Sequence, residues 1–229
     1  MSLYKILKPI SFVIYSNIEE LLAQKLNQFG SASWDKGIKD GVNFDRGEVT
    51  ARNNLKKKIK KDLKTSQNNH CYYCGISFSF FKDKDRNIHV DHILPKNAKH
   101  GRYNQYVFEP RNLVLACPIC NGVDIKGSLD FAENQSSQYI NIRLSIVHPY
   151  FEDITEHLRI DQNTGVVILI HLDKRKGKKM EEIFKFNDST AIRIRLGDIL
   201  FSKKIINDAM MLETENVLTS IPTNGRLSQ

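Results

Sequence analysis

Apolar residues near the N-terminus recur with the spacing of an amphipathic helix. Ser16-Asn17-Ile18-Glu19 resembles a capping box, in which a serine hydroxyl and a glutamate three residues later satisfy the first backbone amides of a helix. Apolar residues follow at near-helical spacing until Gly30. They are Leu21, Leu22, Leu26 and Phe29. The pattern predicts a helix over residues 17–29.

A second helix is predicted over residues 48–65. Leu55, Ile59 and Leu63 recur every four residues and form one apolar stripe, with lysines on the remaining faces. The segment between the two helices contains four glycines and the only tryptophan of the chain, Trp34. Glycine-rich segments disfavour regular structure, so residues 30–47 are predicted to form a loop.

The pattern changes in the second half of the chain. Residues 140–147 and 166–172 are rich in branched apolar side chains and are predicted strands. Asn163-Thr164-Gly165 is a turn signal, which makes a hairpin-like pair plausible. Apolar residues over 189–217 indicate one or two amphipathic helices, and the polar segment 219–229 is predicted to be disordered.

Composition indicates an ordinary globular protein. The chain has 229 residues, of which 41% are hydrophobic and 26% are charged. These values exclude collagen-like and wholly disordered chains. The longest aliphatic run, residues 166–170, is far shorter than the ~20 residues that cross a bilayer. The N-terminal apolar run breaks at Lys8-Pro9 with no small-residue cleavage site after it, so we expect a cytoplasmic protein.

Positive charge is concentrated in one segment. The formal net charge is +8, and residues 51–66 alone carry seven basic side chains and one acidic side chain. This segment suggests a polyanionic partner, nucleic acid first, although a solvated helix face explains the charge equally well. The candidate nucleic-acid contacts there are Lys56, Lys57, Lys60 and Lys61. A second basic patch over residues 172–187 either contacts phosphates or is a solvated loop.

The four cysteines occur in two pairs, Cys71-x-x-Cys74 and Cys117-x-x-Cys120. In a cytoplasmic chain this spacing indicates a metal site rather than a disulfide framework. Two such knuckles supply the four thiolates that suit structural zinc. An iron–sulfur cluster uses the same ligands with different usual spacing, and buried or redox cysteines are the remaining alternative.

Several chemically informative residues lie between the knuckles or directly after them. Forty-two residues separate Cys74 from Cys117, so a zinc ion would close a long excursion of the chain. An acid–histidine pair, Asp91-His92, lies on a predicted strand within it. Asn112 precedes the second knuckle and Asn121 follows it directly. These side chains converge if zinc draws the knuckles together.

These motifs, taken in order, resemble those of the HNH nuclease family, in its subset with a CxxC…CxxC zinc site. The matching residues are Asp91-His92-Ile93-x-Pro95, Asn112-Leu113, Cys120-Asn121 and Lys126-Gly127. They cover residues 71–127, roughly a quarter of the chain. The flanks are distantly similar to HNH nucleases of bacterial anti-phage systems.

The resemblance implies a ββα-metal (His-Me finger) core that binds one divalent ion, Mg²⁺ or Mn²⁺, and hydrolyses phosphodiester bonds. His92 matches the general base, which takes a proton from water. Asp91 and Asn121 match the oxygen ligands of the divalent ion. Asn112 matches a residue that orients the His92 ring through its side-chain or backbone carbonyl. The implied products carry a 5′-phosphate and a 3′-hydroxyl.

Other residues in or near these motifs have possible roles in the site. Lys126 and Lys96 are candidates to hold phosphate. The last motif residue of the family is often histidine and is Asn121 here, which leaves the metal preference open. His89 shares a strand face with Asp91 and either lies beside the site or is an ordinary histidine. Tyr72 and Tyr73, inside the first knuckle, either pack around it or stack on bases, and packing is favoured.

One geometric difficulty concerns Asp91 and His92. Neighbours in a regular strand point to opposite faces, so both cannot reach one phosphate from an ideal strand. We expect a distortion or a strand end at this point, with Pro95 helping to end the ladder.

The sequence as a whole predicts an α+β protein in three regions. Residues 1–66 form a helical basic region, residues 67–135 a zinc-bound nuclease domain, and residues 136–229 an α+β accessory region. The predicted function is a metal-dependent endonuclease acting on DNA in bacterial restriction or anti-phage defence. The alternatives are a non-catalytic zinc-ribbon module that binds nucleic acid or protein, and a nuclease subunit active only with an ATPase partner.

Overall fold

The N-terminal part of the chain is helical, as its pattern predicts. The computed structural model describes residues 10–35, 44–81, 87–170 and 175–202. Helix α1 (Asn17–Asn27) begins with the predicted capping box, in which the Ser16 amide donates to the Glu19 carboxylate at 2.8 Å. A short helix, α2 (Ser31–Trp34), lies inside the segment predicted to be a loop. Gly30 permits it, because its φ of 53° is readily adopted only without a side chain.

Helix α3 (Arg46–Ser66) contains the predicted apolar stripe. Asp45 caps it, with its carboxylate accepting a hydrogen bond from the Glu48 amide at 2.7 Å. Leu55, Ile59 and Leu63 are all buried, which confirms the second predicted helix. Burial of this stripe fixes the lysine-bearing faces of α3 toward solvent.

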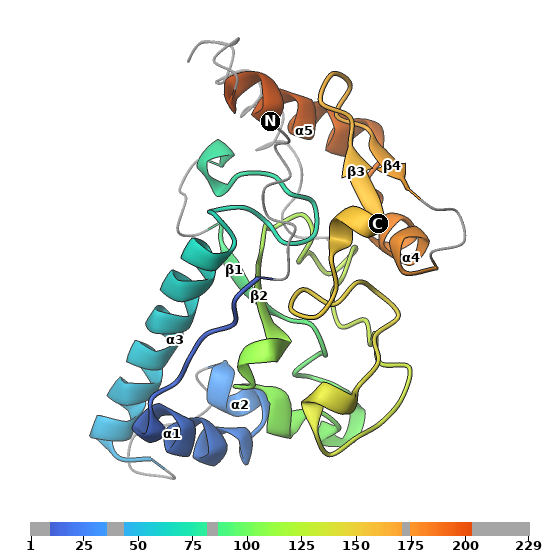
Figure 1. Cartoon of the computed structure of the whole chain (residues 1–229). Helices are drawn as coiled ribbons and strands as arrows, with labels where there is room; N and C mark the ends of the chain where they lie inside the picture. The colour runs from blue at the N-terminus through green and yellow to red at the C-terminus, as the bar shows by residue number, and fades with distance from the viewer. Residues whose placement is uncertain (1–9, 36–43, 82–86, 171–174, 203–229) are drawn as a thin grey trace, which may run out of the picture.

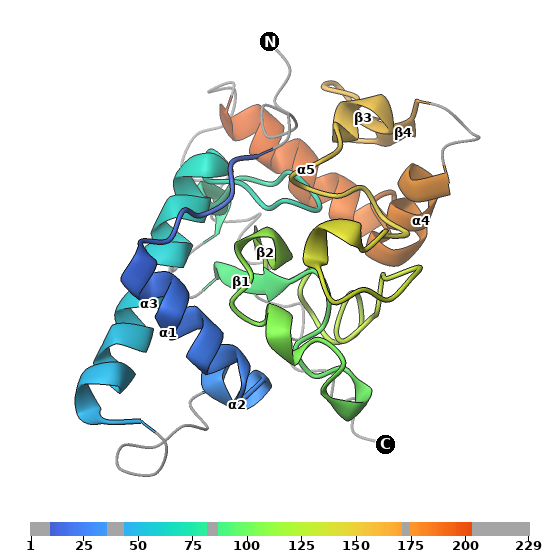
Figure 2. The same cartoon turned by 60° about the horizontal axis from the view of Figure 1, so that its bottom comes forward.

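Two short antiparallel strands lie at the centre of the molecule. Strand β1 (His89–His92) pairs with β2 (Leu113–Ala116), so that His89 lies opposite Ala116 and His92 opposite Leu113. Every residue of β2 is buried. Helices α1 to α3 lie on one side of this pair and the C-terminal elements on the other (Figures 1 and 2). The pair is therefore enclosed by segments that come before and after it in sequence.

The C-terminal hairpin differs from the one that the sequence suggests. Strand β3 (Leu158–Ile160) pairs with β4 (Val167–Leu169) across the predicted turn, which the Asp161 carboxylate stabilises by accepting the Asn163 and Thr164 amides. The predicted strand over 140–147 is wrong. Residues 139–141 form a 3₁₀ turn. In the remainder of the predicted strand, the structure shows one isolated β-bridge, between Leu144 and Ala132. Ile142, Leu144, Ile146 and Val147 are buried by packing on the core rather than by joining a sheet, and Ile140 is exposed.

Helices α4 (Arg175–Phe184) and α5 (Ser189–Ser202) complete the described fold. Helix α5 agrees with the first part of the predicted C-terminal helices, and the rest of that prediction, like the predicted disordered tail, lies outside the described residues. Helix α4 occupies the second basic patch, where no helix was predicted. It buries Met180 and Phe184, so its apolar side belongs to the core.

In the part of the chain that the structure describes, one hydrophobic cluster joins the three predicted regions. It includes Leu26 and Ile59 from the N-terminal helices, Leu115 from β2, and Phe184 and Phe186 from the C-terminal part. Short antiparallel strands and helices around this cluster agree with an α+β class. Within the part of the chain that the structure describes, no helix is both long enough and apolar enough to span a membrane.

Candidate active site

The four cysteines meet as the sequence predicts. Their sulfur atoms all lie within 4.8 Å of one another, and all four residues are buried. Backbone amides donate to the sulfurs, from Cys117 to the Cys71 Sγ at 3.3 Å and from Cys120 to the Cys117 Sγ at 3.4 Å. Four converging thiols with amide donors around them fit a tetrahedral structural zinc ion.

The first knuckle is tied directly to β2. The Tyr72 amide donates to the Leu115 carbonyl at 3.0 Å. Gln67, at the end of α3, continues the same edge: its amide oxygen accepts from the Leu115 amide at 2.7 Å and its nitrogen donates to the Leu115 carbonyl at 2.9 Å. Gln67 thus replaces a neighbouring strand, and the zinc frame, α3 and β2 form one connected unit.

Asp91 lies in a buried polar contact between two donors. Its Oδ2 accepts a hydrogen bond from the Tyr73 hydroxyl at 2.5 Å, and its Oδ1 lies 3.1 Å from the Lys126 Nζ. Burial raises the pKa of Asp91 above its usual value, while Lys126 and Tyr73 act in the opposite direction. Burial also raises the pKa of Tyr73, so its hydroxyl stays protonated as a donor.

Lys126 is an internal cation. Its side chain is 1% exposed, and its ammonium also donates to the His92 carbonyl at 2.8 Å. It therefore does not present its charge at the surface, where the sequence placed it as a phosphate contact.

The segment that carries Lys126 also departs from the expected ββα core, because residues 121–128 form turns rather than an α-helix. Gly127 ends this segment with a φ of 48°, and its amide donates to the Gly122 carbonyl at 2.9 Å.

His92 is the last residue of β1, which agrees with the expected strand end. Its Nε2 lies 3.0 Å from the Val107 carbonyl, and its ring packs edge-on against Trp34 at a centroid distance of 4.6 Å. The residue is 4% exposed. Burial lowers the pKa of His92 to about 3, with Lys96 and Lys126 adding to the effect. The imidazole is therefore neutral near pH 7.

His92 and Asp91 contact different parts of the molecule. His92 contacts the α2 side and the loop around Val107, whereas Asp91 contacts the zinc knuckle through Tyr73. The difference follows from the alternation of side chains along a strand.

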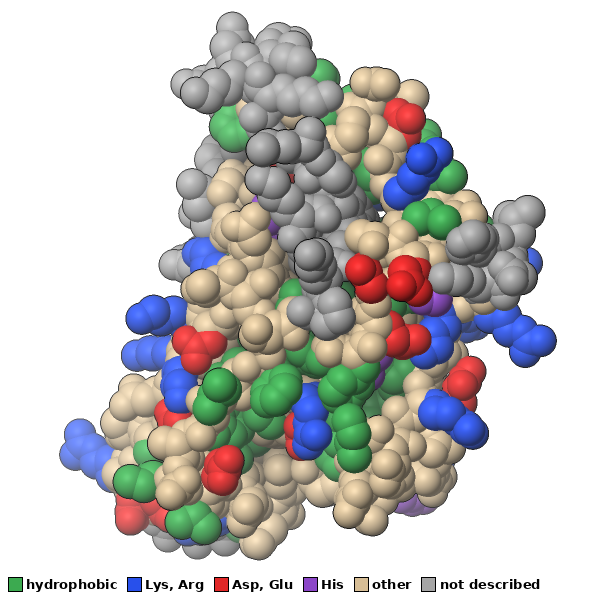
Figure 3. Space-filling view, in the orientation of Figure 1, with side chains coloured by type: hydrophobic (Ala, Val, Ile, Leu, Met, Phe, Trp, Pro, Cys, Tyr) green, Lys and Arg blue, Asp and Glu red, His purple; other side chains and the backbone are tan. Residues whose placement is uncertain are grey.

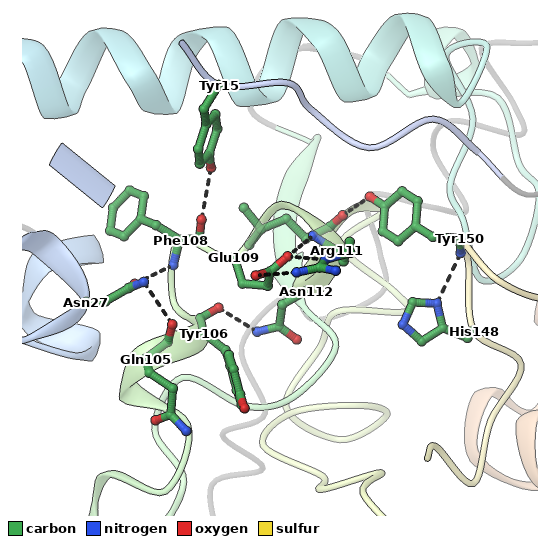
Figure 4. Close-up of polar contacts among 11 residues, drawn as sticks. Tyr15, Asn27, Gln105, Tyr106, Phe108, Glu109, Arg111, Asn112, His148 and Tyr150 are labelled. Carbon is green, nitrogen blue, oxygen red and sulfur yellow. Dashed lines mark hydrogen bonds and ion pairs between the residues drawn. The ribbon is translucent and has the colours of Figure 1, made fainter. Parts of the chain in front are cut away.

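Asn112 is fully enclosed and holds the loop that contacts His92. Its Oδ1 accepts from the Leu94 amide at 2.8 Å, and its Nδ2 donates to the Tyr106 carbonyl at 2.9 Å (Figure 4). Both carbonyls of Asn112 accept backbone amides, the side-chain carbonyl from Leu94 and the main-chain carbonyl from Ile93 at 2.9 Å, while the His92 Nε2 binds Val107. Asn112 thus acts on the neighbouring backbone.

The N-terminal region holds the same loop from the other side. Asn27, at the end of α1, accepts from the Phe108 amide at 2.8 Å and donates to the Gln105 carbonyl at 2.8 Å. The Tyr15 hydroxyl donates to the Phe108 carbonyl at 3.1 Å. Figure 4 shows these contacts converging on the loop from separate elements. The carbonyl that orients His92 is thus fixed by segments far apart in the sequence.

Asn121 follows the second knuckle directly. Its backbone amide donates to the Cys117 carbonyl at 3.0 Å, and its side-chain nitrogen lies 3.1 Å from the His89 Nδ1. His89 is on the same face of β1 as Asp91. A carboxylate and an amide oxygen are donors suited to a hard divalent cation.

Apart from the buried Lys126, the predicted lysine contacts form a basic rim, of which Lys56 and Lys96 contact the segment of Trp34 that packs on His92. Lys56, Lys57, Lys60 and Lys61 all lie on α3. The Lys56 Nζ donates to the Trp34 carbonyl at 2.7 Å and lies 4.7 Å from the centre of its ring. Lys96 pairs with Asp35, beside Trp34. Blue side chains follow the edge of the molecule formed by α3 in Figure 3, and a few others lie beside the region of α4.

The sequence missed three contacts of the site. Tyr73 was expected to pack, yet its buried hydroxyl binds Asp91, and the need of a buried tyrosine for a partner was the available signal. Trp34, the only tryptophan, covers His92. The hydrogen bond between His92 and the Val107 carbonyl could not be predicted from the sequence, because every residue has a backbone carbonyl.

Comparison with known proteins identifies one domain. Residues 71–123 match the family model described as HNH endonuclease. The matched segment contains all four cysteines, Asp91, His92, Asn112 and Asn121, and agrees with the subset that carries a CxxC…CxxC zinc site. Searches of curated proteins and of solved structures found no match to the chain.

Proposed function

Residues 71–123 are an HNH endonuclease domain with four cysteines placed for zinc, and on that premise we propose that the protein is a metal-dependent endonuclease that hydrolyses phosphodiester bonds of DNA. The observation that carries the proposal is the arrangement at the end of β1. His92 is neutral and hydrogen-bonded there, next to a buried carboxylate, in a frame that the zinc knuckles and Asn112 hold.

His92 serves as the general base in this proposal. The Val107 carbonyl can only accept a hydrogen bond, so the proton on the neutral ring resides on Nε2 and the lone pair on Nδ1. Nδ1 is then the atom that takes a proton from the attacking water. The hydrogen bond to Val107 strengthens once the ring is protonated, because a charged donor binds a carbonyl more tightly. Val107 therefore both sets the tautomer and stabilises the product of proton transfer.

Asp91 and Asn121 would hold the divalent ion. A bound Mg²⁺ or Mn²⁺ supplies positive charge to the leaving oxygen of the phosphodiester. Asp91 contributes a carboxylate whose orientation is already fixed, and Asn121 an amide whose nitrogen is engaged by His89. The products that we propose carry a 5′-phosphate and a 3′-hydroxyl.

The basic rim would bind the phosphate backbone. Lys57 and Lys61 are exposed on α3, the Lys56 ammonium lies over Trp34, which packs on His92, and Lys96 pairs with Asp35, the residue after Trp34. Contacts of this kind are independent of base sequence and weaken steeply as salt rises. The rim therefore supports binding near the base without specifying a recognition sequence.

A second candidate is a nuclease subunit that needs a partner, such as an ATPase, before it cuts. The observation that favours it is the cover over His92. The base is 4% exposed, and Trp34 is held in place by Lys56 while its neighbour Asp35 pairs with Lys96. A substrate reaches the imidazole only when a segment that buries it moves, and α2, which carries Trp34, is the segment that we propose. A partner or the nucleic acid itself would supply that movement.

Plasmid cleavage tests the proposal. Purified zinc-loaded protein is incubated with supercoiled DNA and Mg²⁺ or Mn²⁺, with EDTA as the metal control. The variant His92→Asn removes the base. His100→Asn is the matched control, because His100 is exposed and its φ of 58° suits asparagine.

We expect cleavage by wild type and by His100→Asn, and none with EDTA or with His92→Asn. Cleavage that survives His92→Asn would refute the assigned base. Absence of cleavage in all samples, with DNA still retarded on a gel, would favour the partner-dependent subunit or a binding module.

A further inference from the structure

Two adjacent tyrosines inside the first zinc knuckle make different contacts. Tyr72 and Tyr73 lie between Cys71 and Cys74, and both rings are buried. The Tyr72 hydroxyl donates to the Val147 carbonyl at 2.8 Å, in the C-terminal part of the chain. The Tyr73 hydroxyl donates to the Asp91 carboxylate at 2.5 Å. One knuckle thus contacts the core with one tyrosine and the candidate active site with the other.

The hydrogen bond from Tyr73 fixes the plane of the Asp91 carboxylate. A distance of 2.5 Å lies at the short end for a hydroxyl that donates to an ionised oxygen, a class roughly twice as strong as a neutral pair. Lys126 occupies the other oxygen at 3.1 Å. A carboxylate has about four lone-pair positions, so two donors leave room for a cation.

The Tyr73 ring is itself held from two directions. It stacks on Phe184 of α4 with a centroid distance of 4.3 Å and an interplanar angle of 21°. It also contacts Tyr72 edge-on at 5.2 Å. The backbone on either side is anchored by Cys71 and Cys74, whose sulfurs belong to the four-thiol cluster. The hydroxyl therefore has little freedom to leave Asp91.

We infer that Tyr73 is a positioning residue that sets the Asp91 carboxylate for the divalent ion and so connects the zinc knuckle to the metal site. The inference rests on the proposed function, because it requires Asp91 to be a metal ligand. Hydrogen bonds that orient a ligating carboxylate typically contribute 10–100-fold to metal affinity or activity. In this chain that contribution comes from a residue between two zinc cysteines.

Two conservative variants separate positioning from packing. Tyr73→Phe keeps the ring on Phe184 and removes only the hydroxyl that binds Asp91. Tyr72→Phe is the matched control, since it removes one buried hydroxyl from the same knuckle but none from the site. Mn²⁺ binding to the zinc-loaded full chain is measured by calorimetry, with zinc content and the urea midpoint determined for each protein. Asn121→Ala serves as the variant that removes a proposed ligand.

We expect Tyr73→Phe to bind Mn²⁺ about tenfold more weakly than wild type, at unchanged zinc content. Tyr72→Phe should bind within about twofold of wild type while it loses as much urea resistance as Tyr73→Phe. Cleavage by Tyr73→Phe should recover at saturating Mn²⁺.

The outcomes distinguish the inference from the function on which it rests. If Asn121→Ala weakens Mn²⁺ binding and Tyr73→Phe leaves it unchanged, the metal site stands and the role of Tyr73 is refuted. Equal losses in Tyr73→Phe and Tyr72→Phe also refute it, because the effect is then general packing. If wild type binds no Mn²⁺, or Asn121→Ala binds it as wild type does, the assigned metal site is wrong and the inference is overturned with it.

Discussion

Replacement of Lys126 by methionine tests whether a buried ion pair holds the candidate site together. The side chains of Lys126 and Asp91 are 1% and 6% exposed, and the ammonium and carboxylate lie 3.1 Å apart. Methionine has a similar length and keeps contact with the apolar surroundings, which include the Phe131 ring 5.5 Å from the ammonium. The substitution therefore removes the charge with little change in packing.

The expected loss of stability in Lys126→Met follows from the groups that are left without a partner, the Asp91 carboxylate and the His92 carbonyl. Removal of one partner from a buried ion pair costs about 3–5 kcal/mol, because the other charge is left uncompensated. The His92 carbonyl also loses its donor, which adds about 1 kcal/mol. We therefore expect Lys126→Met to lower the free energy of unfolding by about 4–6 kcal/mol, a large part of the roughly 5–15 kcal/mol that stabilises a typical protein.

Urea unfolding of the zinc-loaded protein measures the effect. With an m value of about 3 kcal/mol/M, the expected loss lowers the midpoint by more than about 1 M. Lys61→Met is the matched control, because Lys61 is exposed on α3 and its replacement should leave the midpoint within about 0.2 M.

A double variant checks the cause. Asp91→Asn added to Lys126→Met removes the stranded carboxylate, so the double variant should be more stable than Lys126→Met alone. A shift for Lys126→Met no larger than that of Lys61→Met would refute the buried pair. A double variant less stable than the single one would show that the loss comes from packing rather than charge.

Two further predictions concern zinc and pH. Chelation of zinc should abolish the near-UV circular dichroism of the protein, and the return of zinc should restore it. The reason is that apparent binding free energies of about 10–16 kcal/mol for structural zinc match or exceed the stability of a typical domain. An unchanged spectrum at zero zinc content would contradict a structural role. Burial lowers the pKa of His148 to about 3, so between that value and the unfolded value near 6.5 the unfolded chain binds a proton that the folded protein excludes. Stability should therefore fall as pH decreases from 7 to 5, by up to about 1.4 kcal/mol per pH unit from this residue. His148→Asn, which keeps an acceptor for the Tyr150 amide, should show a shallower fall in urea experiments with excess zinc, and equal slopes would contradict the assignment.

Local patterns in the sequence determined the N-terminal helices, the zinc frame and the identity of the candidate catalytic residues. Helices α1 and α3 were predictable because their caps and apolar stripes are built from residues within a few positions of one another. The two knuckles were predictable because metal ligation requires cysteines at fixed spacing. The HNH domain was recognisable because its motif residues keep their order along the chain.

Tertiary structure alone decided how those residues are held. Tyr73 meets Asp91 across 18 positions, and Lys126 meets the His92 carbonyl across 34. No local pattern encodes such partners, since they depend on which faces become buried together. The same reason explains the error over residues 140–147, whose pattern is typical of a strand, although Leu144, Ile146 and Val147 are buried by packing on the core and only an isolated bridge forms there among the described residues. The sequence by itself thus indicates the candidate catalytic residues and the zinc ligands, while burial and long-range hydrogen bonds decide which neighbours hold them and which of them are charged, oriented and accessible.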